Sequence, residues 1–372
     1  MKIRFVFFTV KKDVPVRCHD LPSSALCAIE QANRLACSPF VFQAAYCLRE
    51  FGIFDFLDRA KEPVSLELLQ KSVPQKLSLY ALRVLTELGV AFNLLSVKDE
   101  KYSITKESRF LINDPMTRVN FDFAHDVCYA GLDELKNALI DGKPDGLKTL
   151  YAGVKTIYPV ISKLPEPAKT SWFKFDHFYS DVSYDASLPV LFADHPAHIC
   201  DIGGNTGKFA LKCCHYDENV RVTIFDLPEQ CAIARQNAED AGFGSRIDTY
   251  PVDLLEQKPL PKVPSDIWWM SQFLDCFSEN QVVSILHRVS DAMNETGRIY
   301  ILEPLIGEQP FEIGNACLAA FSLYFTALAN GTSKFYSLAD FKRFAEQAHL
   351  AIESVHHGLG TGHSLLVLKR AE

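Results

Sequence analysis

The feature that most constrains the fold of this chain is a glycine-containing segment, His198-Ile-Cys-Asp-Ile-Gly-Gly-Asn-Thr-Gly-Lys-Phe209. It reads as a short apolar strand that breaks into a turn, where glycines let the backbone approach a ligand at the opening of a helix. A second apolar strand follows and ends in Asp226, about 23 residues after Gly203. A carboxylate at the end of the second strand of a βαβ unit is placed to accept hydrogen bonds from ribose hydroxyls. The pattern therefore predicts a nucleoside-binding site.

The spacing of the glycines indicates which nucleoside binds. A dinucleotide site has the pattern G-x-G-x-x-G, which accommodates a pyrophosphate at the helix N-terminus. Gly203, Gly204 and Gly207 depart from that pattern, and Asp201 precedes them. An acidic residue here repels a phosphate but suits a cation, and S-adenosylmethionine carries a sulfonium and an ammonium but no phosphate. The alternative is that the glycines serve only the turn, and the position of Asp226 favours the ligand.

Four motifs in the second half of the chain match one family pattern. Asp201-Ile-Gly-Gly-Asn-Thr-Gly207 matches D-x-G-G-G-x-G, with Asn205 in place of the third glycine, and Phe225-Asp-Leu-Pro228 matches F-D-L-P. Val252-Asp-Leu-Leu255 stands in the place of G-D-F-F, and the segment 266–278 aligns without gaps on D-x-Y-L-L-K-x-x-L-H-D-W-S. From about residue 30 onward, the chain thus resembles the small-molecule O-methyltransferases, a family typified by plant caffeic acid and flavonoid enzymes and by bacterial polyketide enzymes.

The resemblance implies S-adenosylmethionine as the methyl donor, with S-adenosylhomocysteine as its product. It places Asp226 on the ribose, Asp253 and Leu254 at the adenine, and two glycines under the methionine end. The full set of expected cofactor-binding residues is Asp201, Gly203, Gly204, Gly207, Asp226, Leu227, Asp253, Leu254 and Ser271.

An aromatic segment in the middle of the chain, Phe175-Asp-His-Phe-Tyr179, corresponds to the part of the family that borders donor and acceptor. The resemblance therefore places Phe175, His177, Phe178 and Tyr179 in a substrate pocket. An aromatic wall favours a flat, hydroxylated aromatic acceptor. The alternative for each of these residues is a place in the hydrophobic core.

The chain departs from its relatives where they carry their catalytic base. Most of them use a histidine, oriented by two carboxylates, to deprotonate the acceptor hydroxyl. The alignment places Asp275 at the histidine and Glu303 at the first carboxylate, and this pair is the predicted catalytic pair. The second carboxylate falls on Phe335 and is missing, and Ser271 replaces a lysine.

Two interpretations of this departure remain open. In the first, Asp275 acts as the base, because burial beside Glu303 raises its pKa. In the second, the protein binds S-adenosylmethionine but catalyses a decarboxylation or a hydroxylation. We favour methylation, because in-line transfer from a sulfonium depends largely on positioning and the cofactor motifs are intact.

The order of the predicted elements indicates two kinds of domain. We expect an N-terminal extension at 1–30, a mainly helical, winged-helix-like dimerisation domain at 31–115, a helical linker and substrate-pocket segment at 116–190, and a catalytic domain at 191–372. The catalytic domain alternates strands and helices and is predicted to be an α/β, doubly wound, Rossmann-like domain.

Several local signals give the expected ends of helices and strands. In the N-terminal domain, Gly52 should end one helix and Ser65 should cap another, and Gly89 should close a helix that precedes a hairpin of 90–93 with 101–105. In the catalytic domain, Ser278 with Gln281 and Ser337 with Asp340 are expected to cap helices. The segments 351–355 and 364–368 should pair at the edge of the sheet.

The N-terminal domain also raises the alternative of a DNA-binding regulator. Between Arg49 and Arg109 the chain has ten basic and nine acidic residues, so this domain is nearly neutral. A nucleic-acid interface needs a basic surface, and the whole chain carries a net charge of −8. We therefore expect a homodimer without nucleic acid as a partner, as in the resembled family.

Composition narrows the remaining classes. A chain of 372 residues is expected to form more than one domain. Its eleven cysteines form no C-x-x-C pair and its eleven histidines do not cluster, so we expect free thiols and no metal. The start of the chain lacks the features of a signal peptide and no apolar run is long enough to span a membrane, so we expect a cytoplasmic enzyme without a membrane partner.

Overall fold

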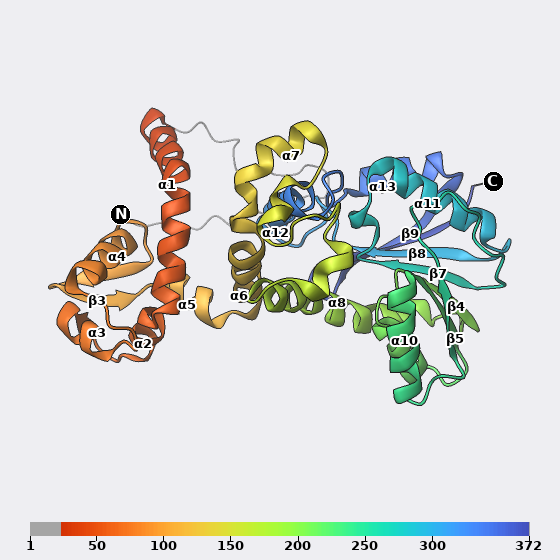
Figure 1. Ribbon diagram of the computed structural model, residues 1–372, viewed down its shortest axis with the longest axis horizontal. Helices are drawn as coiled ribbons and strands as arrows, with labels where there is room; N and C mark the ends of the chain where they lie inside the picture. Colours follow the sequence, from red (N-terminus) through yellow and green to blue (C-terminus); the bar gives the residue numbers. More distant parts are fainter. Residues whose placement is uncertain (1–23, 372) are drawn as a thin grey trace. The chain divides into compact units, whose positions relative to one another are not determined.

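The computed structural model of the protein describes residues 24–371, so most of the predicted extension at 1–30 lies outside the described residues. The chain forms two compact units that divide between Phe121 and Asp122. Figure 1 shows a mainly helical first unit and a second unit built around a large sheet.

The first unit is helical with a small antiparallel sheet of order β1-β3-β2. Leu48, Phe54, Leu69 and Leu82 are completely buried in its core. Its elements are α1 (Ala25–Glu50), α2 (Ile53–Arg59), β1 (Val64–Ser65), α3 (Leu66–Ser72), α4 (Leu79–Ala91), β2 (Leu95–Lys98), β3 (Lys101–Ile104), α5 (Lys106–Asn113) and α6 (Pro115–Asp122), the last of which reaches the unit boundary.

Two local predictions in this unit hold and two are wrong. Gly52 follows α1 in a left-handed conformation, and the Ser65 side chain accepts a hydrogen bond from the Leu68 N–H. Gly89, however, lies inside α4, which continues to Ala91. It packs closely there, because a Cβ would stand 3.1 Å from the Leu95 side chain. The extra turn of helix moves the first hairpin strand from 90–93 to 95–98, where it pairs with 101–104.

The second unit contains a seven-stranded sheet of order β6-β5-β4-β7-β8-β10-β9. The first five strands in this order, β6, β5, β4, β7 and β8, pair in parallel. Strand β10 pairs with β8 and with β9 in antiparallel fashion. The strands are β4 (His198–Ile202), β5 (Arg221–Asp226), β6 (Ile247–Pro251), β7 (Ile267–Ser271), β8 (Arg298–Glu303), β9 (Leu350–Leu359) and β10 (His363–Arg370). The predicted edge pair is therefore present, with longer strands than expected.

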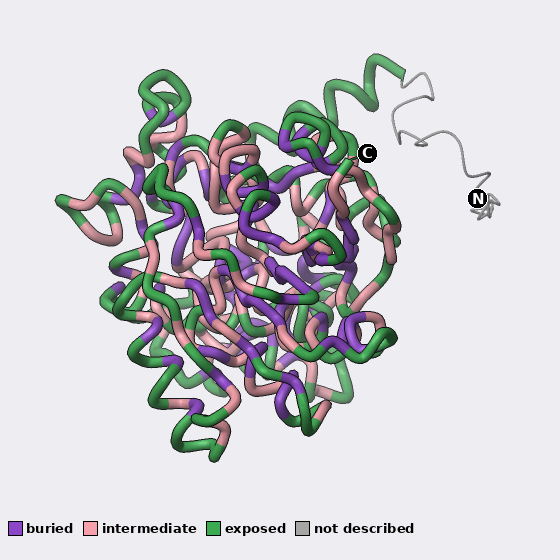
Figure 2. Tube along the Cα trace, turned by 90° about the vertical axis from the view of Figure 1, so that its right-hand side faces the viewer, coloured by how far each residue is buried: buried purple, intermediate pink, exposed green. Residues whose placement is uncertain are grey.

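Helices cover both faces of this sheet, as predicted for a doubly wound domain. One face packs on α8 (Ala168–Leu191), α9 (Lys208–Tyr216) and α10 (Pro228–Asp240), and the other packs on α11 (Glu279–Ala292) and α13 (Leu338–Gln347). Side chains of β7 alternate between the two cores, with Trp268 in one and Trp269 in the other. Figure 2, which faces this unit, shows the buried residues in its interior.

Hydrogen bonds fix the starts of α11 and α13 as predicted. The Ser278 N–H donates to Gln281 Oε1 at 2.9 Å before α11. The Ser337 N–H donates to Asp340 Oδ2 at 3.0 Å before α13, and the Asp340 N–H donates back to Ser337 Oγ at 3.2 Å. Both are capping boxes, which satisfy N–H groups that have no partner within the helix.

A third cluster of helices belongs to the second unit. Phe123, Val127, Leu147, Val160 and Leu328 are among its buried residues. Its elements are the π-helix η1 (Phe123–Tyr129), η2 (Gly131–Glu134), α7 (Leu135–Asp141), η3 (Asp145–Thr149), η4 (Tyr158–Lys163), α12 (Glu312–Tyr324) and the π-helix η6 (Phe325–Ala329).

The helical stretch 312–329 in this cluster is the one part of the described chain whose length and composition would suit a membrane span. Its mean hydropathy is 1.3 and 28% of it is buried. A single helix of this kind is weak support for a membrane protein.

Candidate active site

The glycine loop between β4 and α9 has a backbone that side chains would disrupt. Gly203 has φ +73°, and a Cβ on it would lie 2.3 Å from the Phe273 ring. A Cβ on Gly204 would lie 2.5 Å from Asp201 Oδ2. Asn205, which stands in place of the family's third glycine, also has a positive φ of 51°. Asparagine tolerates this conformation better than most residues, so the substitution preserves the shape of the loop.

Asp226 connects the end of β5 to this loop. Its Oδ2 accepts a hydrogen bond from the Asn205 N–H at 2.8 Å, and its Oδ1 accepts one from the Leu227 N–H at 2.7 Å. Burial raises the pKa of this carboxyl, and the two N–H donors oppose that rise. The carboxylate is thereby held at the carboxyl edge of the parallel strands, where ligands of such sheets bind.

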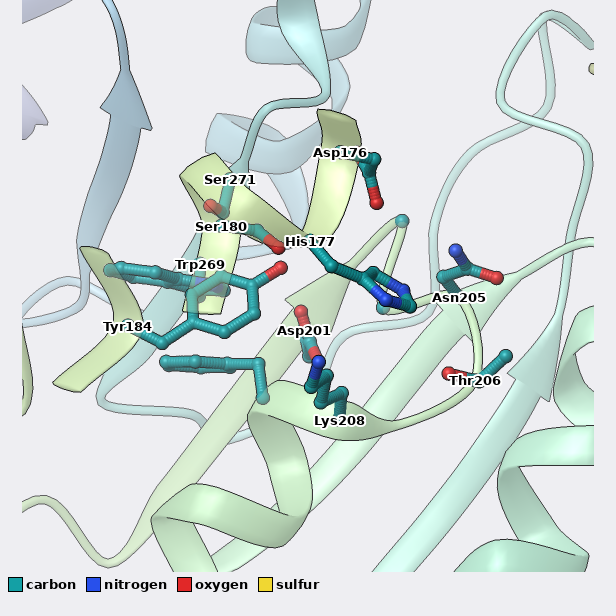
Figure 3. Close-up of a pocket in the computed structure, with 13 residues that line it drawn as sticks. Asp176, His177, Ser180, Tyr184, Asp201, Asn205, Thr206, Lys208, Trp269 and Ser271 are labelled. Atoms are coloured by element: carbon teal, nitrogen blue, oxygen red, sulfur yellow. The ribbon is translucent and has the colours of Figure 1, made fainter. Parts of the chain in front are cut away.

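A pocket opens between α8, the glycine loop and the end of β7 (Figure 3). Five predicted residues line it, and they come from both the cofactor set and the substrate set: Asp201, Gly203, Gly204, Ser271 and His177. The other eight lining residues are not among the predicted site residues: Asp176, Ser180, Tyr184, Asn205, Thr206, Lys208, Phe209 and Trp269.

The remaining predicted residues lie outside this lining. Gly207 precedes α9 and its N–H donates to the Gly204 carbonyl at 2.9 Å. Leu227 precedes α10, and Asp253 follows β6, where its Oδ1 accepts a hydrogen bond from the Leu255 N–H. Leu254 is buried in the core between the sheet and α11.

Two carboxyl groups dominate the electrostatics of the pocket. Asp201 is 2% exposed, and its Oδ2 has no hydrogen-bond partner among residues 24–371. Burial, together with the nearby Asp226, raises the pKa of Asp201 to about 8. Burial also raises the pKa of Asp176 to about 6, against the opposing charges of His177 and Lys208. A buried carboxylate without a partner is costly, so this pocket suits a cationic ligand.

The pocket offers no separate metal site. In the part of the chain that the structure describes, no group of three or more histidine, cysteine or acidic residues is arranged to hold a metal ion.

Asp275, the predicted base, lies in the short 3-10 helix η5 (Leu274–Cys276) beyond Ser271. It is 6% exposed, and its Oδ1 has no hydrogen-bond partner within the described chain. Burial raises its pKa to about 7; the Cys276 side chain lowers this pKa and the charge of Asp176 raises it. The charge of Asp176, which lines the pocket, therefore acts on the carboxyl group of Asp275.

Glu303, the other member of the predicted pair, fixes the loop that carries Asp275. Its Oε1 accepts hydrogen bonds from the N–H groups of Phe273 and Leu274, both at 2.9 Å. Burial and the charge of Asp275 raise the pKa of Glu303 well above its usual value. Phe335, at the position of the missing second carboxylate, is buried and meets the Phe325 ring edge to face at 5.2 Å. No carboxylate supports Asp275 from that position.

A buried histidine outside the predicted site residues connects this loop to α8. His363 Nε2 lies 2.7 Å from Gln272 Oε1, and its Nδ1 lies 2.8 Å from Ser183 Oγ. Burial lowers the pKa of His363 to about 3, so the ring is neutral. Gln272 has a positive φ of 46°, and its N–H donates to the Leu302 carbonyl. Residues of β8 and β10 thus fix the backbone and the side chain of Gln272, which follows Ser271.

The predicted aromatic wall is partly core. Phe175 stacks on Phe123 with a centroid distance of 4.1 Å and meets Phe321 edge to face at 5.2 Å. Phe178 and Tyr179 contact each other at 5.2 Å. The pocket face of α8 is instead formed by Asp176, Ser180 and Tyr184, each four residues from the next, together with His177. That helical spacing was a usable signal in the sequence.

Comparisons with known proteins agree with this geometry. Residues 191–349 match the family described as O-methyltransferase domain, and residues 30–102 match the Dimerisation2-like domain. Human acetylserotonin O-methyltransferase is 22% identical over 72% of this chain and 78% of its own length. A 3-hydroxy-5-methyl-1-naphthoate 3-O-methyltransferase of Streptomyces sahachiroi is 33% identical over 30% of this chain and 31% of its own length. The crystal structure of the S-adenosylmethionine-dependent methyltransferase SibL has a TM-score of 0.68 at 19% identity and covers 92% of this chain and 100% of its own.

The fold and the site therefore define a methyltransferase with a Rossmann-like catalytic unit. Within that class, the chain belongs to the S-adenosylmethionine-dependent O-methyltransferases, and it combines an O-methyltransferase domain with a Dimerisation2-like domain. The predicted family, enzyme class and Rossmann-like fold class are confirmed, whereas the winged-helix form of the first unit stays a prediction.

Proposed function

We propose that this enzyme methylates a hydroxyl group of an aromatic small molecule and that Asp275 removes the hydroxyl proton. The observation that carries the proposal is the placement of two buried, unpaired carboxylate oxygens. Within the described chain, Asp201 Oδ2 and Asp275 Oδ1 both lack a hydrogen-bond partner. The first suits a cationic donor, and the second suits a hydroxyl group that must lose a proton.

The residues around the glycine loop fit S-adenosylmethionine, which supplies an electrophilic methyl group when bound. Asp226 would hold the ribose hydroxyls, because its carboxylate is fixed at the end of β5 and retains lone pairs. Asp253 and Leu254 would flank the adenine, with Leu227 next to the ribose. Asp201, Gly203, Gly204 and Ser271 would surround the methionine end, and Gly207 shapes the loop beneath it.

Asp275 would act as the base at its Oδ1. An ordinary aspartate is a weak base, but a pKa of about 7 leaves about half of this carboxylate ionised at neutral pH and makes it a better proton acceptor. Glu303 is a positioning residue in this scheme, since it holds the two N–H groups before Asp275. Burial and the charge of Asp275 raise the pKa of Glu303 well above its usual value, since two close carboxyl groups resist ionising together.

The relatives support an aromatic acceptor. Their names specify acetylserotonin and a hydroxylated naphthoate as substrates. In this chain His177 lines the pocket, and Phe175, Phe178 and Tyr179 lie on the same helix within a group of aromatic rings. Rings of this kind bind flat aromatic molecules through stacked and edge-to-face contacts.

The first unit, which we interpret as winged-helix-like, would hold a homodimer. The helix α1 exposes large apolar side chains that a second copy could cover: Leu26 at 80%, Ile29 at 58%, Leu35 at 75% and Phe40 at 69% exposure. The match to a Dimerisation2-like domain supports this assembly. Light scattering should give twice the chain mass, and a monomer would contradict the dimer. A salt-sensitive shift with duplex DNA would instead support a regulator, and we propose a cytoplasmic enzyme without such a partner.

The reaction is tested by labelled methyl transfer. The purified protein should transfer a labelled methyl group from S-adenosylmethionine to the oxygen of one or more members of a set of phenols, catechols and hydroxylated aryl acids. Calorimetric titration should show binding of S-adenosylmethionine and none of NAD. Label on nitrogen or carbon would overturn O-methylation of an aromatic hydroxyl. Release of carbon dioxide or hydroxylation without methyl transfer would instead establish the non-methylating alternative.

A further inference from the structure

The pocket at the glycine loop contains one fixed positive charge. Of the thirteen lining residues, all within the described chain, Lys208 alone is a lysine or arginine. Asp176 and Asp201 are its acidic members. Ser271, which stands where relatives have a lysine, contributes no charge. A ligand that carries both an ammonium and a carboxylate would meet complementary charges here.

Lys208 is positioned at the rim of this pocket by two helices. It is the first residue of α9, directly after Gly207, and Figure 3 shows its side chain among the pocket residues. Its Nζ forms an ion pair with Asp181 of α8. The Lys208 charge also lowers the pKa of Asp176, which places it within electrostatic reach of the pocket carboxylates.

The Lys208 ammonium group has three N–H donors, and the ion pair with Asp181 leaves donors for a ligand. The Lys208 side chain remains 40% exposed, so it can reach a ligand while Asp181 limits its rotation. A lysine that is held but not enclosed is suited to a ligand carboxylate.

We propose that Lys208 binds the carboxylate of the methionine part of S-adenosylmethionine. Asp201 and Asp176, opposite Lys208, bind the ammonium group of the same methionine part. This inference rests on the proposed function. It assigns the recognition of the amino-acid end of the cofactor to a charge pair between α8 and α9 that none of the sequence motifs contains.

The neighbouring turn of α9 provides a matched control. Lys212 lies four residues after Lys208 and pairs with Asp185, which lies four residues after Asp181 on α8. The two ion pairs therefore connect the same helices, but Lys212 is absent from the pocket lining. Any effect that comes only from loosening α8 against α9 should appear in both lysine variants.

The experiment measures calorimetric affinities of four proteins for two ligands. The proteins are wild type, Lys208→Met, Lys212→Met and Lys208→Arg, and the ligands are S-adenosylmethionine and decarboxylated S-adenosylmethionine. Lys208→Met should weaken S-adenosylmethionine about tenfold or more, which corresponds to a charge-assisted hydrogen bond at a partly exposed site. Lys212→Met should stay within about twofold of wild type, and Lys208→Arg should keep most of the affinity.

The second ligand identifies the group that Lys208 contacts. Decarboxylated S-adenosylmethionine should bind wild type and Lys208→Met with similar affinity, because the contact no longer exists. An equal loss for both ligands, or equal losses in the two lysine→Met variants, would overturn the inference. Failure of wild type to bind S-adenosylmethionine at all would instead refute the proposed function.

Discussion

The two halves of the active site are built in different ways. On the donor side, the glycine loop and Asp226 are joined by backbone hydrogen bonds, and the loop conformation excludes most side chains. On the acceptor side, Asp275 owes its position to side chains from distant segments, among them Glu303 and His363. The donor side keeps the family motifs and the acceptor side departs from them. A site fixed by its own backbone tolerates little change, whereas a site held by side chains allows more variation in its residues.

The largest effect is expected from removing the proposed base. Asp275→Asn should lower kcat about a hundredfold or more, because a buried amide cannot accept the hydroxyl proton. The affinity for S-adenosylmethionine should stay near that of wild type, since Asp275 lies outside the lining of the donor pocket. Steady-state rates and calorimetry give both values. Asp275→His should retain activity, and a fully active Asp275→Asn enzyme would mean that the proton leaves by another route.

A change on the donor side should weaken the binding of S-adenosylmethionine and leave kcat nearly unchanged. Asp226→Ala removes the acceptor for two backbone N–H groups and the proposed ribose contact, so the Kd for S-adenosylmethionine should rise about ten- to hundredfold. At saturating donor, kcat should change much less. Asp248→Ala is the matched control, because Asp248 lies on the neighbouring strand in an exposed ion pair with Arg221. Equal affinities of the two variants would contradict the role of Asp226.

The pH dependence of the rate should distinguish the halves further. The base works only when ionised, and the pKa of Asp275 is about 7. At saturating donor, kcat should therefore be level above pH 7 and fall about tenfold for each pH unit below it. This fall should be absent from the residual activity of Asp275→Asn. A flat wild-type profile between pH 5 and 8 would show that Asp275 does not titrate in the reaction.

What the sequence could predict follows the same division. Asp201, the three glycines and Asp226 stand in one short βαβ unit, so their spacing along the chain determines their arrangement. Asp176 and His363 belong to elements that meet the glycine loop and the loop after β7 only in the folded protein, and no motif connects them. Asp176 was still within reach through its four-residue spacing to Ser180.

The wrong prediction at Gly89 has a similar cause. A glycine near the end of an apolar helix is typical of a C-cap, but Gly89 lies within the helix and packs closely on Leu95, where a Cβ would stand 3.1 Å away. That contact is tertiary, and the local pattern around Gly89 could not indicate it. The pKa values of Asp201 and Asp275 likewise depend on how deeply the two side chains are buried, and a sequence alignment does not show burial.

The smallest expected effect concerns the stability of the folded protein. It tests whether the buried carboxyl group of Asp201 destabilises the protein when no ligand is bound. The unfolded chain has an Asp201 pKa near the usual 3.8, and the folded protein raises it to about 8. Between these values the folded state holds a proton that the unfolded state has released. Stability therefore falls as pH rises from about 4 to about 8, and the full penalty is present above pH 8.

Asp201→Asn should remove this contribution. Without ligand, the melting temperature of the variant relative to wild type should increase between pH 6 and pH 9, by about 2 to 4 °C for each kcal/mol regained. Asp176, Asp275 and Glu303 are present in both proteins, so their titration cancels in the difference. Asp248→Asn, an exposed control on β6, should show no such trend. Calorimetry at the two pH values measures this difference in melting temperature. A difference that is constant or shrinks from pH 6 to pH 9 would mean that ionised Asp201 does not destabilise the folded protein. Asp201 would then not be the unpaired buried charge that we propose binds the cationic donor.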